Sequence, residues 1–189
     1  PDTCIVVGDN GAHGDPAPLF DSLNVTGLVR RTTDGGRTWN PVGLPGIVRT
    51  ITYVDCVPSV CLASGWADVP GGPWAVLRST DLGATWSLAA PPVTTNQPPY
   101  PECADTTCFL TVQPPLAAIG EVYRSTDLGL TWGFRSQVQS YPFVCATADR
   151  CIANDAGGRP LATSDGASTW TSATLPPGVT VAIPTTCTP

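Results

Sequence analysis

The stretch 78-RSTDLGATW-86 occurs four times along the chain in related forms. The other copies are 31-RTTDGGRTW-39, 124-RSTDLGLTW-132 and 162-ATSDGASTW-170. Their aspartates follow one another at steps of 47, 46 and 38 residues. A sustained period of this length indicates an array of similar structural units, each too small to bury its own apolar face.

Each repeat contains four short apolar runs separated by turn residues, and no run shows the period of a helix. In the second repeat we expect strands at 47–55, 61–65, 74–79 and 85–89. Two cysteines flank the first turn, and the aspartate motif forms the third turn. Units of four strands at this spacing predict an all-β fold, a four-bladed β-propeller of four-stranded antiparallel blades.

The two ends of the chain supply complementary parts of one blade. The run 4-CIVVG-8 matches the second strand of a blade, and 179-VTVAIPTTC-187 matches a first strand. We therefore expect the terminal strands to pair, close the ring and bring Cys187 to Cys4. The expected single domain, 1–189, has blades at about 1–46 plus 178–189, 47–92, 93–138 and 139–177.

Composition excludes several classes of protein. The 189 residues carry a net charge of -6, and all nine basic residues are arginines. A nucleic-acid partner is not expected, because it requires clustered basic residues. No apolar run approaches the length of a membrane span. The 21 prolines and 19 glycines fit a chain that turns every few residues, and we expect a monomer.

The cysteines point to an oxidising compartment. Their number is even, and six form close pairs separated by four or five residues. These spacings fit zinc sites poorly, since structural zinc pairs are usually closer. We expect disulfides, and with them a secreted, extracellular protein. The eight are Cys4, Cys56, Cys61, Cys103, Cys108, Cys145, Cys151 and Cys187.

The repeated motif S/T-x-D-x-G-x-T-W resembles the Asp-box, or BNR, repeat. Three copies match it well, and the fourth has Ala167 in place of the second glycine. With its cysteine pairs, the chain resembles secreted actinobacterial propellers of the dispase autolysis-inducing type. Asp-box repeats occur in sialidases, other propeller glycosidases, sortilin-type receptors and the photosystem II assembly factor. Familiar members have six or more blades, so four is a departure.

We expect the Asp-box residues to serve folding and not chemistry. Their aspartates can accept backbone N–H groups within the turn, and their tryptophans can pack between sheets. The eight residues are Asp34, Trp39, Asp81, Trp86, Asp127, Trp132, Asp165 and Trp170.

Binding residues are expected in the irregular loops, which share the face of the propeller opposite the repeated turns. The longest loop, 9–24, contains the single histidine, and the loop 65–74 and the link 91–101 add aromatic residues. Aspartates of the first loop could hold calcium, or could simply form turns; no other cofactor is expected. The candidate ligand-binding residues are Trp66, Asp68, Trp74, Tyr100, Phe20 and His13, and the candidate calcium ligands are Asp9, Asp15 and Asp21.

Two classes of function compete. The first is a non-enzymatic protein that binds a protein or a glycan through the loop face. The second is a sialidase-like glycoside hydrolase, which needs two positioned carboxyl groups. The chain has only Glu102 and Glu121 as glutamates, and neither belongs to a local nucleophile–base arrangement. We therefore expect no catalytic residues and favour binding; a fragment of a larger propeller is the third alternative.

Overall fold

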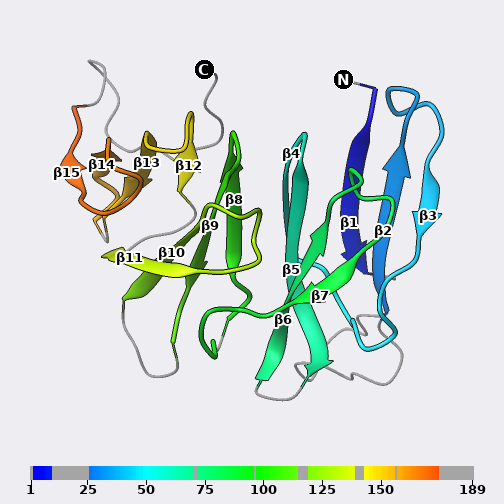
Figure 1. The fold of residues 1–189 in the computed structure, drawn as a ribbon. Coiled ribbons are helices and arrows are strands. Elements are labelled where there is room, and N and C mark those ends of the chain that lie inside the picture. Colours follow the sequence, from blue (N-terminus) through cyan, green and yellow to red (C-terminus); the bar gives the residue numbers. More distant parts are fainter. Residues whose placement is uncertain are drawn as a thin grey trace.

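The computed structural model describes residues 2–9, 26–69, 72–95, 97–114, 119–138, 143–155 and 157–174. Every regular element in this part of the chain is a strand, and the strands form four antiparallel sheets. The sheets lie side by side in chain order, with the first and the fourth at opposite ends of the array (Figure 1). The expected all-β, antiparallel propeller architecture is confirmed, whereas closure of the ring is not shown.

The first sheet has three strands in the described residues, and each other sheet has four. The fourth strand expected for the first sheet falls in 178–189, outside the described residues. In order along the chain, the strands of the first two sheets are β1 (Cys4–Asp9), β2 (Gly27–Thr32), β3 (Asn40–Val42), β4 (Tyr53–Val57), β5 (Val60–Val69), β6 (Gly72–Ser79) and β7 (Ser87–Ala89). Those of the last two are β8 (Tyr100–Ala104), β9 (Thr107–Val112), β10 (Gly120–Ser125), β11 (Gly133–Val138), β12 (Val144–Cys145), β13 (Cys151–Asn154), β14 (Pro160–Thr163) and β15 (Thr171–Ser172).

The three close cysteine pairs are disulfide-bonded, as the sequence predicts. Each bond joins directly opposed residues at the hairpin between the first two strands of its sheet. The bonds are Cys56–Cys61, Cys103–Cys108 and Cys145–Cys151. Cys4 is an exposed, free thiol in the structure. Because its expected partner Cys187 lies outside the described residues, the terminal disulfide stays a prediction.

The aspartate of each repeated motif holds its own turn closed. Asp81 accepts hydrogen bonds from the Thr85 backbone N–H at 2.9 Å, the Thr85 hydroxyl at 2.6 Å and the Ser79 hydroxyl at 2.7 Å. The same pattern recurs at Asp34, Asp127 and Asp165. Donors around a carboxylate favour its charged form. The hydrogen bonds from Thr85 thus lower the pKa of Asp81 to about 2.

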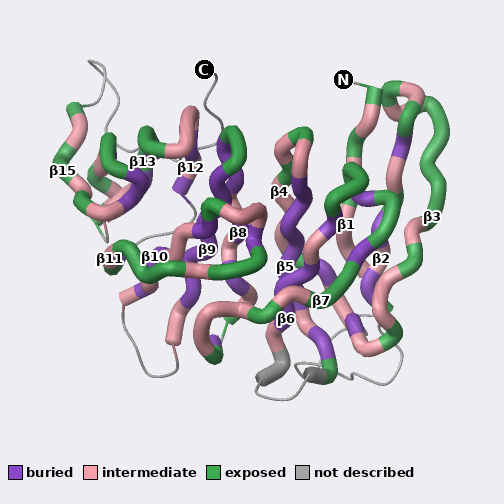
Figure 2. The backbone as a smooth tube through the Cα atoms, in the orientation of Figure 1, coloured by how far each residue is buried: buried purple, intermediate pink, exposed green. Residues whose placement is uncertain are grey.

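The core lies between the sheets. Val29 of the first sheet clusters with Ala63 and Leu77 of the second, and Phe109 of the third sheet clusters with Ala153 of the fourth. Buried segments are concentrated in the middle strands of the second and third sheets, and the outer strand β3 is mostly exposed (Figure 2). Stacked apolar faces therefore hold the array together.

Candidate binding site

The sheets have two different ends. One, the turn end, carries the disulfide hairpins and the aspartate turns. The other, the loop end, is where β5 meets β6 and where the links between sheets enter β4 and β8. Trp66 and Trp74 are directly opposed partners on β5 and β6 at the loop end. Their rings are 6.5 Å apart and tilted by 49°, and both are half-buried.

The segment that connects β3 to β4, residues 43–52, lies along this end of β5. We call it the link. The Trp66 carbonyl accepts hydrogen bonds from the backbone N–H groups of Arg49 at 2.8 Å and Thr50 at 3.2 Å. The approach is possible because residue 65 is glycine: a Cβ there would lie 1.9 Å from the Thr50 carbonyl oxygen. The strand expected at 47–55 therefore begins only at Tyr53, with a single bridge at Val48 before it.

This link also positions an ion pair beside the tryptophans. The Arg49 guanidinium donates to one carboxylate oxygen of Asp68 from Nε at 2.8 Å and from Nη2 at 2.5 Å. Both side chains keep solvent contact, with 33% and 51% of their surfaces exposed. An exposed pair of this kind adds little stability, but it presents a polar group of fixed orientation.

A second aromatic pair crosses the seam between the second and third sheets. The hydroxyls of Tyr53 and Tyr100 lie 2.8 Å apart, and the ring centroids are separated by 4.1 Å. The Ser64 hydroxyl donates across the same seam to the Pro99 carbonyl. Because side chains alternate along a strand, Ser64 and Trp66 share one face of β5. Trp66 thus lies at the loop end of the seam that Tyr53 and Tyr100 bridge.

Deeper in the array, carboxylates connect the inner strands. Asp55 accepts the backbone N–H of Cys103 at 2.5 Å, and Glu102 accepts that of Cys145 at 2.7 Å. Burial raises the pKa of Glu102 to about 8, and the negative charge of Asp55 adds to the effect. Burial likewise raises the pKa of Asp55. Both groups act as connectors between consecutive sheets.

The other glutamate lies elsewhere. Glu121 accepts a hydrogen bond from the Tyr123 hydroxyl at 2.7 Å. Burial, together with this bond, raises the pKa of Tyr123 to about 12. Cross-strand pairing puts Glu102 in a row with Phe109 and Arg124. Because Glu121 is an odd number of residues from Arg124 on β10, it points to the opposite face of the sheet.

Of the residues that the sequence singles out for binding, the structure places Trp66, Asp68 and Trp74 together at the loop end and Tyr100 in the adjoining seam. His13 and Phe20 lie outside the described residues. The same is true of Asp15 and Asp21, so the calcium site is untested; Asp9 is the last residue of β1. Within the described ranges, no three His, Cys, Asp or Glu side chains come together as a metal site.

Sequence reasoning missed three residues of this region: Arg49, Tyr53 and Ser64. Tyr53 was detectable, since it stands three residues before Cys56, as Tyr100 stands three before Cys103. Arg49 and Ser64 gave no such signal, because their contacts depend on where the links dock.

Comparison with known proteins identifies the fold. No family model and no curated protein matches the chain. Among solved structures, YCF48 from Cyanidioschyzon merolae is similar, with 20% identity, a TM-score of 0.51 and coverage of 82% of this chain and 52% of that one. The Hadza microbial sialidase Hz136 follows, with 16% identity, a TM-score of 0.54 and coverage of 77% and 36%. A further match, YCF48 bound to D1 peptide, has 16% identity, a TM-score of 0.44 and coverage of 77% and 59%.

At these identities the first two matches show a propeller fold and nothing of function. The chain spans less than two thirds of the length of each of these proteins.

Proposed function

We propose that the chain is a secreted, non-enzymatic binding protein, a disulfide-stapled propeller that holds a protein or glycan ligand at its loop end. The observation that carries this proposal is the half-buried Trp66–Trp74 pair at the loop end of a seam bridged by Tyr53 and Tyr100. Such rings offer large apolar area with few rotatable bonds, which favours binding of sugar faces and of extended peptides.

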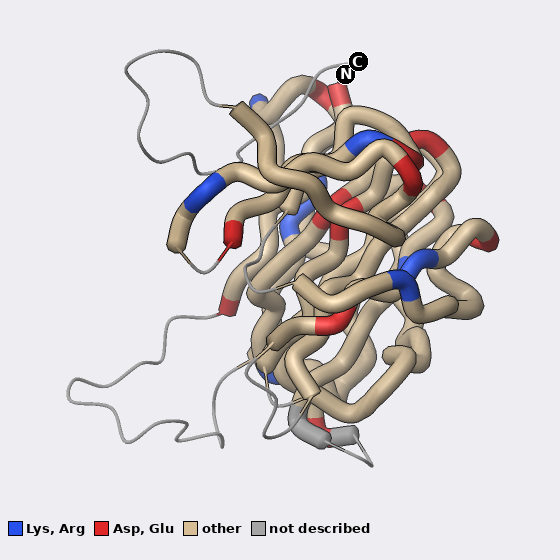
Figure 3. The backbone as a smooth tube through the Cα atoms, turned by 90° about the vertical axis from the view of Figure 1, so that its left-hand side faces the viewer, with Lys and Arg blue, Asp and Glu red and all other residues tan. Residues whose placement is uncertain are grey.

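The turn end is less suited to a ligand. Its aspartates already accept hydrogen bonds from neighbouring threonines and serines, and its hairpins are closed by disulfides. At the loop end, the Arg49–Asp68 pair adds a charged, partly exposed group beside the rings. In the backbone view of Figure 3, arginine positions are scattered among Asp and Glu positions.

Secretion is the part of the proposal that rests on the cysteines. Three disulfides persist in oxidising compartments and are rare where thiols are kept reduced. In the described residues, no helix is long and apolar enough to cross a membrane.

The binding function is tested by titrating the chain calorimetrically with soluble oligosaccharides and, separately, with unstructured peptides. For the ligand that binds, Trp66→Ala and Trp74→Ala should each weaken affinity about tenfold or more. Phe134→Ala is the matched control, because this aromatic side chain is 55% exposed on the outer strand β11. Binding that the tryptophan variants leave unchanged would contradict the proposed site.

A glycosidase is the alternative, and the Tyr123–Glu121 hydrogen bond is the observation in its favour. Two features oppose it. The raised pKa of Tyr123 keeps the phenol protonated and weakly nucleophilic. Glu102 and Glu121 also occupy opposite faces of the third sheet, and so cannot flank one glycosidic bond. Turnover of an aryl sialoside or another aryl glycoside, abolished by Glu121→Gln, would replace the binding proposal.

A further inference from the structure

One arrangement of side chains recurs wherever one sheet packs on the next. A residue of the second strand of a sheet inserts against the aspartate turn of the following sheet. A Cβ at Gly83 would lie 2.3 Å from Cδ1 of Ile5, and one at Gly129 would lie 2.9 Å from Cδ2 of Leu62. At the third contact, Phe109 and Ala167 belong to one buried cluster.

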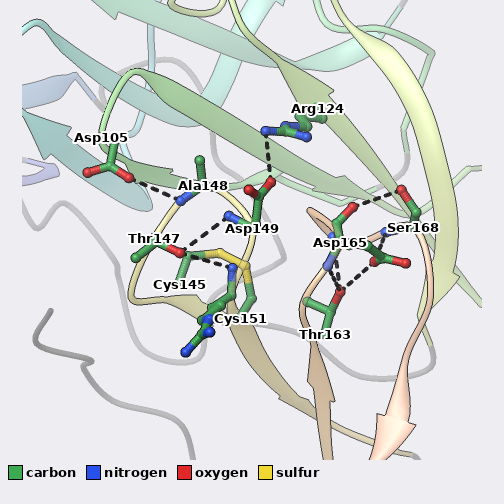
Figure 4. Close-up of polar contacts among 12 residues, drawn as sticks. Asp105, Arg124, Cys145, Thr147, Ala148, Asp149, Cys151, Thr163, Asp165 and Ser168 are labelled. Carbon is green, nitrogen blue, oxygen red and sulfur yellow. Dashed lines mark hydrogen bonds and ion pairs between the residues drawn. A yellow bond between two sulfur atoms is a disulfide. The ribbon is translucent and has the colours of Figure 1, made fainter.

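Polar side chains flank each inserted residue. Arg31 donates from Nε to the Leu82 carbonyl at 2.8 Å, and Arg78 donates to the Leu128 carbonyl at 2.6 Å. Arg124 contacts Asp149 at 3.3 Å in the fourth sheet (Figure 4). On the side away from the arginine, Asp55 stands opposite Leu62 and Glu102 stands opposite Phe109 in the strand pairing.

The fourth sheet repeats this row, and among the described residues no further sheet packs on it. Pairing aligns Val144, Ile152 and Ala162 as it aligns Glu102, Phe109 and Arg124 in the third sheet. We call this row the trailing face. In the fourth sheet, Val144 stands in place of the glutamate and Ala162 in place of the arginine. Ile152 is 38% exposed, whereas Leu62 and Phe109, at the same position, are fully buried.

On the side that faces away from the second sheet, the first sheet has exposed residues whose counterparts in the other sheets are more deeply buried. We call this side, with Val6, Gly36 and Trp39, the leading face. Val6 is 53% exposed there, and its counterparts Ala63, Leu110 and Ala153 are buried. Trp39 is 41% exposed, against 8% for Trp86 at the same position of the second sheet. Among the described residues, a Cβ at Gly36 would contact only Trp39, so none of their side chains fills the place that Ile5 and Leu62 fill in the next two sheets.

We infer that the trailing face of one copy of the chain binds the leading face of a second copy, with Ile152 inserting against Gly36. This continues the interface that already joins the internal sheets. A copy cannot use its own leading face in this arrangement, because the first and fourth sheets stand at opposite ends of the array (Figure 1). The two similar propeller chains are longer than this one, which covers 52% and 36% of them. Head-to-tail contacts close when the rotation permits, and two copies then form one ring.

Sedimentation of the full chain tests this directly. The wild type should sediment with the mass of two chains at micromolar concentration. All variants are compared in a Cys4→Ser background, which removes any disulfide between copies. Ile152→Asp and Val6→Asp should each sediment as one chain there, because each buries a charge in both contacts of the ring. Leu130→Asp is the control, since Leu130 is 64% exposed on the aspartate turn of the third sheet and should keep the two-chain mass. Unchanged circular dichroism shows that the variants fold.

Mixing the two variants separates head-to-tail pairing from any other self-association. In a mixed pair, one contact carries both substitutions and the other carries none. An equimolar mixture of Ile152→Asp and Val6→Asp should therefore regain a two-chain species that neither variant forms alone. A wild type that sediments as one chain, or a mixture that stays at one-chain mass, would overturn the inference.

Discussion

The carboxylate of Glu102 in the third sheet accepts the backbone N–H of Cys145 in the fourth at 2.7 Å. It thereby ties one disulfide hairpin to the next. The same relation links Asp55 of the second sheet to Cys103 of the third. Each acid immediately precedes the first cysteine of its own pair. Burial of these groups makes the contact between sheets sensitive to pH.

Glu102→Gln should flatten the pH dependence of stability above pH 5. The pKa of Glu102 is about 8 in the folded chain, against 4.5 for an ordinary glutamate. Between these values the folded chain holds a proton that the unfolded chain has released, so stability falls as pH rises. Glutamine keeps an acceptor for Cys145 and carries no charge. We expect a higher Tm than wild type at about pH 8 and a smaller change in Tm between about pH 5 and pH 8. If the Tm of the variant changes with pH as steeply as that of the wild type, the result would contradict the burial of the Glu102 carboxyl group.

The aspartate turns should act in the opposite direction, at acid pH. The folded pKa of Asp81 is about 2, below its ordinary value of 3.8. Its contribution is complete above the ordinary pKa and is lost as pH falls toward the folded pKa. Asp81→Asn should lower Tm at neutral pH and make the decline of Tm below about pH 4 shallower. Thr85→Val, which removes one donor to Asp81, should give a smaller change of the same sign. If neither substitution alters how Tm falls at acid pH, the result would count against the role of these hydrogen bonds.

Leu62 and Ile152 occupy equivalent positions and should respond differently to truncation. Leu62 is fully buried against the third sheet, whereas Ile152 is 38% exposed. Leu62→Ala should cost about 2–5 kcal/mol in the free energy of unfolding, because it leaves a cavity between sheets. Ile152→Ala should cost less than about 1 kcal/mol in the single chain. Urea unfolding at a concentration that keeps the chain single compares the two, and equal losses would be inconsistent with the trailing face being uncovered.

The repeat made much of this architecture predictable. The aspartate motif and the cysteine pairs recur in phase, so the strands, turns and three disulfides could be assigned from local sequence. The departures were visible too: Val144 stands where Asp55 and Glu102 stand in their repeats, and Ala162 replaces the arginine before the motif. The consequence of these two replacements could not be predicted from the sequence, because it depends on which faces of the sheets pack against a neighbouring sheet.

The candidate site was predictable only in part. Trp66, Asp68 and Trp74 were found because they lie in the segment 65–74, which we expect from the sequence to be one loop. That expectation was wrong: β5 extends to Val69 and β6 begins at Gly72, so the three residues lie on the paired ends of these strands. The ion pair of Arg49 with Asp68 was not, since it depends on a link crossing β5, and nothing in the spacing of residues 47–52 indicates that crossing. Tertiary docking there overrides the strand pattern that the apolar residues suggest.

Gly65→Ala should disturb this crossing. The new Cβ would meet backbone atoms of the link, with the Thr50 carbonyl oxygen at 1.9 Å and Cα of Ile51 at 2.8 Å, so the link must move. We expect a lower Tm and weaker ligand binding at the loop end, since Arg49 is displaced with the link. Gly133→Ala is the matched control: its nearest neighbour, the Arg124 carbonyl oxygen, is 3.9 Å away. Equal Tm values for the two variants would show that the link can yield without cost.

Cys4 should be disulfide-bonded to Cys187. In β1 it stands opposite Thr32, as Cys61, Cys108 and Cys151 stand opposite the Ser or Thr that begins each aspartate turn. Each of those three cysteines is bonded to the first strand of its own sheet. Non-reducing peptide mapping should recover the peptides of Cys4 and Cys187 as one species that separates on reduction. Within one chain such a bond would stabilise the fold by about 5 kcal/mol through loop entropy. In the head-to-tail ring it joins two copies instead, and a non-reducing gel should then show a doubled mass that reduction halves. Alkylation of Cys4 without prior reduction would refute both forms of the link.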